Sequence, residues 1–240
     1  MSVLPYKDKE TPKRQQVEEM FDNISPKYDL LNHLLSAGVD VYWRKKAISL
    51  LKNSPNRVIL DVATGTGDFA LEAMKLRPEK IIGVDISEGM LKIGEEKIRK
   101  AGYADTISFR KASSESLPFA DNYFDAVIVS FGVRNFENLE NGLREMHRVM
   151  KEEGTCIVME FSKPQSFPFK QLYNFYFRNI LPLIGRLVSK DTSAYTYLPD
   201  SVQAFPDGRK FLDIFERAGF KNTECTQLTF GICSIYIGHK

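Results

Sequence analysis

Glycines and carboxylates gather where two apolar runs of this sequence end. In VILDVATGTGDFA, the glycines Gly65 and Gly67 and the acid Asp68 follow the first run, and a second run, IIGV, ends in Asp85. A glycine turn lets the backbone approach a ligand closely, and a carboxylate after the next strand can accept hydrogen bonds from ribose hydroxyls. The spacing therefore predicts a site for a nucleoside-containing ligand at these two strand ends.

The residue types narrow that ligand to two candidates. A dinucleotide turn would carry a third glycine at position 70, where Ala70 stands, although alanine is tolerated there. Asp68 begins the following helix, where a pyrophosphate would bind, and its charge would repel that anion. An acid at this place suits the cationic S-adenosylmethionine better than NAD. The glycines alone leave both ligands open.

The bulk composition argues against several other functions. The chain has 240 residues, 43% of them hydrophobic, and a formal net charge of +2, so no nucleic-acid partner is indicated. Cys156, Cys225 and Cys233 show no metal-ligand spacing, and we predict neither a metal site nor a disulfide. The N-terminus lacks the apolar core of a signal peptide, and no run is long enough to span a bilayer. We therefore expect a cytoplasmic protein.

The elements that would position these residues alternate along residues 57–163. Apolar runs such as RVILDVA, KIIGVDIS, YFDAVIVSFG and GTCIVMEFS are separated by helical segments, which is typical of a parallel sheet covered on both faces. Near the end, KNTECTQLTFGICSIYIGHK has two strands that meet at Gly231 without a helix, so one strand must be antiparallel. We expect an α/β fold with a doubly wound, mostly parallel seven-stranded sheet and one antiparallel C-terminal strand.

The same pattern divides the chain into a tail and one domain. Polar residues and two prolines over 1–14 predict a flexible tail, and the helical spacing of Val17, Met20, Phe21 and Ile24 predicts an N-terminal helical cap. Within the domain, 15–240, the predicted segments are a helical cap (15–55), a cofactor-binding core (57–163), a substrate-lid insertion (164–205) and a closing helix with a strand pair (206–240).

Longer blocks of the sequence resemble a known family. DVATGTGDFA, GVDISEGML and LREMHRVMKEEGTCIVMEFSKP are similar to the class I S-adenosylmethionine-dependent methyltransferases, which have a Rossmann-like fold. KYDLLNHLLSAGVDVYWR, SFGVRNF and YTYLPDSVQAFPDG resemble, more specifically, the ubiquinone/menaquinone biosynthesis C-methyltransferase family. The resemblance covers residues 15 to 240. It implies S-adenosyl-L-methionine as the cofactor and a polyprenylated quinol as the substrate.

The resemblance also implies which residues bind the cofactor. It assigns the methionine part to the glycine turn, the ribose to the acid after the second strand, the adenine to the segment before LPF, and a further contact to the end of the fourth strand. These positions are Thr64, Gly65 and Gly67 with Asp68 nearby, then Asp85, then Ser113 and Ser114, and finally Ser130. Relatives often carry Asn or Asp where Ser113 stands, so a backbone or water contact is the alternative to a direct bond from this shorter side chain.

The implied reaction is methylation of an aromatic ring carbon of the quinol. That carbon becomes nucleophilic when a ring hydroxyl loses its proton, which needs help at neutral pH because a phenol titrates near pH ~10. We predict that Arg134 steadies the developing quinolate and that Asn135 orients the ring, with a water or a hydroxyl as the base. His33, Tyr195 and Tyr197 are further candidates on the substrate side.

The identity of the acceptor stays open at this point. The overall resemblance favours demethylmenaquinol, which would become menaquinol in menaquinone biosynthesis, over the benzoquinol intermediate of ubiquinone biosynthesis. A non-catalytic scaffold that binds S-adenosylmethionine in a quinone-synthesis complex is a third interpretation, against which the intact glycine turn and Asp85 argue. The sequence leaves a homodimer open.

Residues 167–188 combine aromatic and apolar residues with interspersed Lys and Arg. We predict a lid or groove that takes up the isoprenoid tail and makes transient contact with the membrane surface, as a peripheral protein at its inner face. The alternative is an ordinary pair of helices packed on the sheet.

Overall fold

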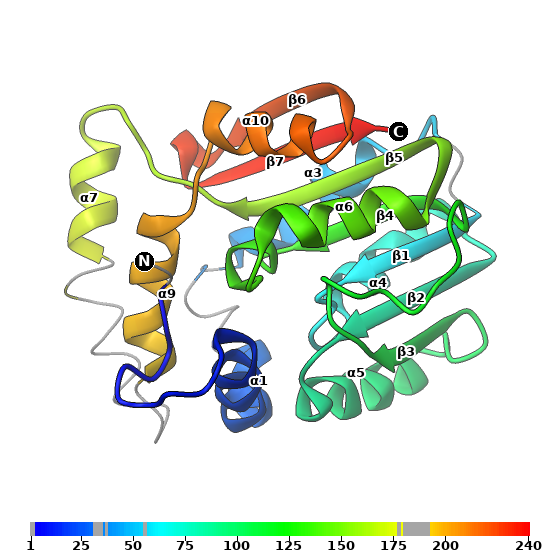
Figure 1. Cartoon of the computed structure of the whole chain (residues 1–240), viewed down its shortest axis with the longest axis horizontal. Helices are drawn as coiled ribbons and strands as arrows, with labels where there is room; N and C mark the ends of the chain where they lie inside the picture. The colour runs from blue at the N-terminus through cyan, green and yellow to red at the C-terminus, as the bar shows by residue number, and fades with distance from the viewer. Residues whose placement is uncertain (1–2, 31–35, 37, 55–56, 177–178, 180–192) are drawn as a thin grey trace.

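One seven-stranded sheet forms the centre of the protein in the computed structural model, which describes residues 3–30, 36, 38–54, 57–176, 179 and 193–240. The strand order is β3-β2-β1-β4-β5-β7-β6 (Figure 1). The strands are β1 (Val58–Val62), β2 (Lys80–Asp85), β3 (Ile107–Lys111), β4 (Phe124–Ser130), β5 (Met150–Phe161), β6 (Lys221–Leu228) and β7 (Cys233–His239). Strands β1 to β5 pair in parallel, and β7 lies antiparallel between β5 and β6. The predicted fold class, with its single reversed strand, is confirmed.

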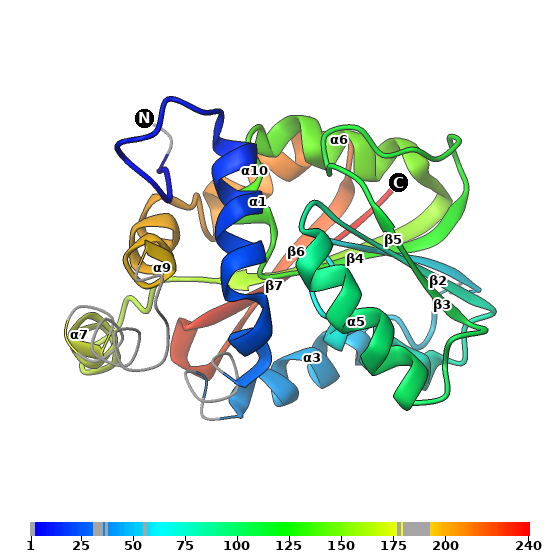
Figure 2. The same ribbon diagram turned by 90° about the horizontal axis from the view of Figure 1, so that it is seen from below.

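Helices cover both faces of this sheet. Figure 2 shows α6 and α10 on one side of the sheet and α3 on the other. The α-helices are α1 (Lys13–Ile24), α3 (Val39–Ser49), α4 (Asp68–Ala73), α5 (Glu88–Lys100), α6 (Leu139–Val149), α7 (Phe169–Phe175), α9 (Ser193–Ala204) and α10 (Arg209–Arg217). Short 3-10 turns occur at η1 (Ser25–Lys27), η2 (Met74–Leu76), η3 (Val133–Asn135) and η5 (Thr229–Gly231).

Strand β4 shows why the middle of the central strands is largely apolar. Its side chains alternate between two buried clusters, because successive residues of a strand face opposite sides of the sheet. Val127 and Val129 pack with residues of α6 and α10, whereas Ala126 and Ile128 pack with residues of α3 and α4. The four positions from Ala126 to Val129 are therefore all apolar, and the strand ends at Ser130, which is only partly buried.

The carboxyl ends of the parallel strands face a layer of separate helices, α1, α9 and α7 (Figure 1). Helix α1 packs against α5 and α9, with Val17, Met20 and Ile24 buried in that contact. Asp22 of α1 accepts hydrogen bonds from the Ser87 hydroxyl at 2.6 Å and from the Gly89 amide at 2.9 Å, at the start of α5. The N-terminal helix is therefore fastened over the end of the sheet where the site was expected.

Part of the segment predicted as a flexible tail makes specific contacts. Helix α1 begins at Lys13, and Pro5 is buried. Gln16 of α1 accepts a hydrogen bond from the Tyr6 amide at 3.0 Å and donates to the carbonyls of Lys9 and Thr11. A buried glutamine satisfied by backbone groups holds this segment beside the helix, so the tail has a defined path before the expected domain boundary.

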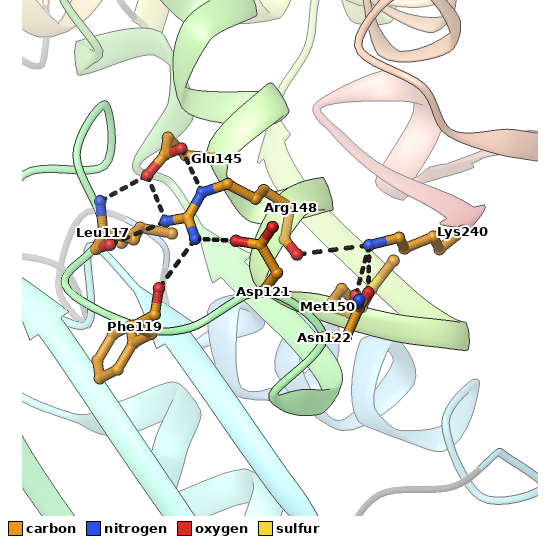
Figure 3. A network of polar contacts seen from close by, with 8 residues as sticks. All are labelled: Leu117, Phe119, Asp121, Asn122, Glu145, Arg148, Met150 and Lys240. Atoms are coloured by element: carbon orange, nitrogen blue, oxygen red, sulfur yellow. Dashed lines mark hydrogen bonds and ion pairs between the residues drawn. The ribbon is translucent and has the colours of Figure 1, made fainter.

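A polar network away from the strand ends fixes the loop between β3 and β4 (Figure 3). Arg148 of α6 forms ion pairs with Glu145 at 2.7 Å and Asp121 at 2.6 Å, and also donates to the carbonyls of Leu117 and Phe119. The planar guanidinium can make these bonds in several directions at once. Lys240, drawn beside it, binds the side chain of Asn122 and the carbonyls of Arg148 and Met150.

None of the helices in the described ranges combines the length with the apolar character that crossing a bilayer requires.

Candidate active site

A pocket opens at the carboxyl ends of β1, β2 and β4, which we call the strand-end pocket. Four of the predicted cofactor residues line it, Gly65, Asp85, Ser114 and Ser130. The other four, Thr64, Gly67, Asp68 and Ser113, do not. The structure therefore brings half of the expected set to one cavity and gives the remaining residues other contacts.

Asp85 and Gly65 are joined directly at the floor of this pocket. The buried Asp85 carboxylate accepts hydrogen bonds from the amides of Gly65 and Ser87, both at 2.9 Å. Burial raises the pKa of Asp85, and these amide donors oppose that rise. Gly65 has a φ of +56°, and a Cβ added there would meet the ring of Tyr28 at 3.8 Å. A side chain at this position would therefore extend toward the residue that covers the pocket.

Gly67 is required by packing that the sequence pattern did not indicate. Its φ is +83°, and a Cβ there would lie 2.6 Å from the ring of Phe109. Gly83 and Gly94 would place a Cβ equally close to the same ring, at 2.6 Å each. Phe109 thus fills a notch made by three glycines. Gly67 makes room for this packing beneath the turn, and its role in the approach of a ligand stays a prediction.

Thr64 turns away from the pocket toward a buried acid. Its hydroxyl donates to Asp61 Oδ2 at 2.6 Å, and its amide donates to the Val84 carbonyl at 3.0 Å. Asp61 is fully buried, and its Oδ1 has no hydrogen-bond partner among the residues that the structure describes. Burial raises the pKa of Asp61 to about 7. Thr64 therefore supports the turn from below through Asp61.

Asp68 is neutralised by cations from two other elements. Its carboxylate lies 2.7 Å from Lys97 Nζ of α5 and 3.3 Å from Arg44 Nη2 of α3. Lys97 also lies 2.6 Å from Asp29 Oδ2. The expectation that Asp68 presents its charge to the cofactor does not match this placement. Charges other than that of Asp68 must therefore disfavour a pyrophosphate in this pocket.

Those charges come from the lining of the strand-end pocket itself. Asp85, Glu115 and Glu137 contribute carboxylates, whereas Arg14 is the one cationic side chain in the described lining. An excess of acids favours a cationic ligand over an anionic one. The preference for S-adenosylmethionine over a dinucleotide thus rests on these residues.

The segment expected to contact adenine is split in the same way. Ser113 donates its hydroxyl to Glu115, whose other oxygen accepts the amides of Glu137 at 2.8 Å and Asn138 at 3.3 Å. Ser114, its neighbour, lines the pocket. The short side chain of Ser113 is thus engaged within its own loop, and its contact with adenine stays a prediction.

The N-terminal cap supplies lining residues that the motifs did not identify. Arg14, Val17 and Phe21 of α1, together with Tyr28, form one wall of the strand-end pocket. Lys13 fastens this wall by donating to the carbonyl of Phe136 at 2.8 Å. The apolar stripe of α1 was the one feature of the sequence that could have indicated these lining residues. Such a stripe is buried against another part of the protein, here the end of the sheet.

A larger apolar cavity, with a volume of about 400 Å³, adjoins the strand-end pocket. Phe21, Tyr28 and Phe131 line both spaces. Six further aromatic residues line the cavity: Trp43, Phe161, Phe169, Tyr173, Tyr176 and Tyr197. Two ligands bound in these spaces would therefore meet at Phe21, Tyr28 and Phe131.

Arg134 supplies a cation to the wall of the apolar cavity. Its Nη1 lies 2.8 Å from Oε1 of the fully buried Glu160, and it also donates to the Phe131 carbonyl. Its guanidinium lies 5.5 Å from the centre of the Phe161 ring. Arg134 Nε is buried and has no hydrogen-bond partner within the described part of the chain. The side chain is thus held rigidly with one donor unused.

Asn135 faces the other space. It lines the strand-end pocket and not the apolar cavity, so it is separated from the place where a quinol ring was expected. Its Oδ1 is buried and without a hydrogen-bond partner among the described residues. An unused acceptor in an acidic pocket suits an ammonium or amino group. Of the further candidates, Tyr197 lines the apolar cavity, His33 lies outside the described residues, and so does the side chain of Tyr195.

These observations fit S-adenosylmethionine. The molecule is cationic and carries an ammonium group, a ribose and an amino-substituted base. The strand-end pocket offers an excess of carboxylates, the Asp85 carboxylate at the end of β2 and the unused Asn135 oxygen. No cluster of three or more metal-ligating side chains occurs in the ranges that the structure describes.

Comparison with known proteins places this chain among close relatives. Demethylmenaquinone methyltransferase from Bacteroides fragilis is 49% identical over 239 residues, which cover 99% of this chain and 97% of the relative. The enzyme of the same name from Porphyromonas gingivalis is 44% identical and covers 99% of this chain and 98% of its own. Ubiquinone/menaquinone biosynthesis C-methyltransferase UbiE from Geotalea daltonii is 47% identical, over 96% and 98% respectively.

Solved structures agree on the fold. An S-adenosylmethionine-dependent methyltransferase from Thermotoga maritima matches with a TM-score of 0.66 at 20% identity, over 92% of this chain and 99% of its own. The [4+2]-cyclase SpnF matches with a TM-score of 0.64 at 17% identity, over 96% and 97%. The model of the ubiE/COQ5 methyltransferase family matches residues 9–240. The chain therefore belongs to the ubiE/COQ5 methyltransferase family.

Proposed function

We propose that this protein transfers the methyl group of S-adenosylmethionine to a ring carbon of demethylmenaquinol. The observation that carries the proposal is the junction of the two spaces, because the acidic strand-end pocket and the aromatic-walled cavity share Phe21, Tyr28 and Phe131. A cationic methyl donor suits the first and a polyprenylated ring suits the second. The Bacteroides fragilis and Porphyromonas gingivalis relatives are both demethylmenaquinone methyltransferases.

In the proposed complex, the strand-end pocket orients the cofactor. Asp85 would accept hydrogen bonds from the ribose hydroxyls, and Gly65, Ser114 and Ser130 would form the surface against which the cofactor rests. Asn135 would accept a hydrogen bond from an amino or ammonium group, since the residue lines this pocket and its buried oxygen is otherwise unused. The bound cofactor supplies an electrophilic methyl group.

The side chains of the apolar cavity would prepare the acceptor. A ring hydroxyl must lose its proton so that charge reaches the neighbouring carbon, which then attacks the methyl group and later loses its own proton to restore the aromatic ring. Arg134 would donate from Nε to the quinolate oxygen, and a hydrogen bond to a charged group is worth about 1.5–3 kcal/mol. Positioning the ring against the methyl group contributes further.

The proton acceptor in this scheme is water. Arg134 stays protonated and cannot accept the proton. Glu160 is fully buried, and its two oxygens already accept bonds from Arg134 and from the Phe161 amide. Burial raises the pKa of Glu160, with Arg134 opposing the rise, but the carboxylate is not part of the described cavity wall. A water admitted with the substrate is left as the base.

The direct test is methyl transfer from labelled cofactor to two short-chain quinols, a demethylnaphthoquinol and the benzoquinol intermediate, assayed side by side. We expect turnover with the naphthoquinol. The benzoquinol is the second candidate because the Geotalea daltonii relative is named for both pathways. Cofactor binding without methylation of either quinol would overturn the proposal and favour a scaffold.

Two substitutions separate the proposed roles of Arg134 and Asn135. Arg134→Lys keeps a cation beside Glu160, and we expect lower kcat with unchanged cofactor affinity. Asn135→Ala should weaken cofactor binding and leave KM for the quinol unchanged, as measured by calorimetry and by initial rates. The opposite split for Asn135 would return it to the ring-orienting role first predicted from the sequence.

We further propose that the mouth of the apolar cavity rests on an anionic membrane surface. Phe167, Leu172, Phe175 and Phe230 are among the most exposed large apolar side chains described, and Phe169 stacks on Phe230 with ring centres 3.7 Å apart. Helix α7 lies at the outer edge of the molecule beyond α9 (Figures 1 and 2).

The charge pattern of the sequence supports an anionic surface. Residues 161–190 contain five Lys and Arg and not one Asp or Glu, whereas the rest of the chain has 28 basic against 31 acidic residues. Basic and aromatic residues together favour binding at the lipid headgroups. The protein would then act as a peripheral protein at the inner face of the membrane, where polyprenyl quinols are dissolved.

Liposome co-sedimentation tests this contact. Neither Phe167 nor Phe175 lines the cavity, so Phe167→Ser/Phe175→Ser should reduce binding to vesicles that contain anionic lipid and leave turnover of a short-chain quinol intact. Tyr103→Ser, an exposed aromatic residue after α5, is the matched control. Equal sedimentation of the double variant and the unmodified protein would contradict the membrane contact.

A further inference from the structure

Tyr197 has a buried hydroxyl that nothing described in the structure satisfies. Tyr197 lies on α9, is 3% exposed and packs against α1 in one cluster with Val17 and Met20. Its Oη is buried and has no hydrogen-bond partner among the described residues. Leaving such a group unpaired costs about 1–3 kcal/mol. An apolar ring would fill the same space without that cost, so the hydroxyl needs a reason beyond packing.

The surroundings of Tyr197 indicate where that reason lies. The residue lines the apolar cavity together with Arg134. The charges that act on the pKa of Tyr197 are those of Arg134 and Glu160, so its hydroxyl lies within the electrostatic range of this buried ion pair. A ligand there would meet two unused donors, Arg134 Nε and Tyr197 Oη.

We propose that Tyr197 Oη donates a hydrogen bond to the quinol oxygen that Arg134 faces, and so acts as a second catalytic residue of the methyl transfer. This role rests on the proposed function. The bond would fix the ring at the junction of the two spaces and would strengthen as the oxygen becomes negative. Tyr197 keeps its proton throughout, because the quinol proton passes to water.

Tyr197 suits a donor and not a base. Burial raises its pKa to about 12, above the ordinary value, with Arg134 partly opposing the rise. The phenol therefore stays protonated at neutral pH. Two fixed donors on one oxygen form an arrangement similar to an oxyanion hole, in which preorganised donors stabilise charge that develops during the reaction.

Tyr236 provides a matched control. It is also buried, but it lies in the core under α10, and its hydroxyl accepts a hydrogen bond from the Gly208 amide at 2.7 Å. Removing the hydroxyl of Tyr236 breaks an existing bond, whereas removing that of Tyr197 breaks none in the free protein. Both Tyr→Phe substitutions remove a buried hydroxyl. We expect the change at Tyr197 to affect catalysis and the change at Tyr236 to affect stability.

The experiment compares Tyr197→Phe, Tyr236→Phe and the unmodified protein. For Tyr197→Phe we expect a Tm equal to or above that of the unmodified protein, unchanged cofactor affinity, and a kcat/KM for the short-chain demethylnaphthoquinol lower by roughly 10- to 100-fold. The acidic limb of its kcat profile should move to higher pH by about one unit, because a quinol that has lost a donor deprotonates less readily. Tyr236→Phe should have a lower Tm and retain kcat.

Each other outcome decides against the role. A kcat/KM within about twofold of the unmodified protein would show that the hydroxyl does not touch the substrate. A loss of Tm in Tyr197→Phe as large as in Tyr236→Phe would show a structural partner instead. An unmodified protein that binds the cofactor but methylates neither quinol would overturn the proposed function, and the role of Tyr197 with it.

Discussion

Asp29 accepts a 2.5 Å hydrogen bond from the hydroxyl of Thr66, which joins the segment after α1 to the glycine turn. Its second oxygen lies 2.6 Å from Lys97, which also binds Asp68 on the far side of the turn. The wall over the strand-end pocket and the turn beneath it are thus held by one carboxylate. Asp29 therefore fixes the position of the neighbouring Tyr28, which lines the strand-end pocket, relative to the glycine turn.

Asp29→Ala should therefore weaken cofactor binding more than it weakens the fold. The hydrogen bond to Thr66 is worth about 1 kcal/mol and the partly exposed ion pair less, so we expect affinity to fall about five- to tenfold. Hydrogen exchange of residues 13–30 should rise in the same variant. Glu96→Ala, which removes an exposed ion pair with Lys100 on α5, is the control and should change neither.

The two glycines of the turn should fail in different ways. Gly67→Ala forces a Cβ to 2.6 Å from Phe109 at a positive φ, and overpacking with backbone strain should destabilise the fold by about 2–4 kcal/mol. Gly65→Ala meets only Tyr28 at 3.8 Å, and should lower stability by about 1 kcal/mol while weakening cofactor binding at least tenfold.

Urea unfolding and calorimetry distinguish the two variants, and a second substitution tests the cause. Phe109→Leu should restore part of the stability that Gly67→Ala loses, because the smaller leucine leaves room for the added Cβ. Additive losses in the double variant would show that Phe109 is not the reason for this glycine.

The sequence was sufficient to predict the fold because the spacing of its apolar residues indicates which faces of the strands and helices are buried. The apolar strands between helices predicted the parallel sheet, and the missing helix at Gly231 predicted the reversed β7. Side-chain direction within a turn carries no such signal. Thr64 and Gly67 lie within two residues of Gly65, yet Thr64 donates to Asp61 and Gly67 makes room for Phe109, a residue of β3 more than 40 positions later in the sequence.

Arg134 and Asn135 show the same limit. They are neighbours in the 3-10 turn η3, where successive side chains point about 120° apart. One therefore lines the apolar cavity and the other the strand-end pocket. The spacing of the motif could assign Arg134 and Asn135 to the site, but it could not show that they face different ligands. Arg134 is held by Glu160, which lies on another strand and is not part of the motif.

Arg148 should matter for stability and not for turnover. Arg148→Ala removes an ion pair with the partly buried Glu145 and leaves the carbonyls of Leu117 and Phe119 without their donor (Figure 3). We expect the free energy of unfolding to fall by about 2–3 kcal/mol. Measured at saturating cofactor, kcat should stay within about twofold. Arg148→Lys should recover little, because an ammonium cannot reach all four groups; full recovery would contradict the network.

Asp61 makes the stability of the ligand-free protein depend on pH. It lies at the end of β1, fully buried, with Thr64 donating to one oxygen. Burial raises its pKa to about 7, compared with about 3.9 in an unfolded chain. The native state therefore holds this proton more tightly than the unfolded state does. The stabilisation is complete below about pH 4 and is lost as the pH rises through 7.

The amide in Asp61→Asn does not titrate. From pH 4 to pH 8 the free energy of unfolding of the unmodified protein should therefore fall relative to that of the variant, by up to about 4 kcal/mol. The slope is the test, because an amide also changes the hydrogen bonds at every pH. Urea titrations at several pH values measure it, with Asp105→Asn at an exposed acid controlling for the loss of one charge. Parallel curves for Asp61→Asn and the unmodified protein would show that Asp61 is already ionised in the native state, and a cation must then lie close enough to stabilise it there.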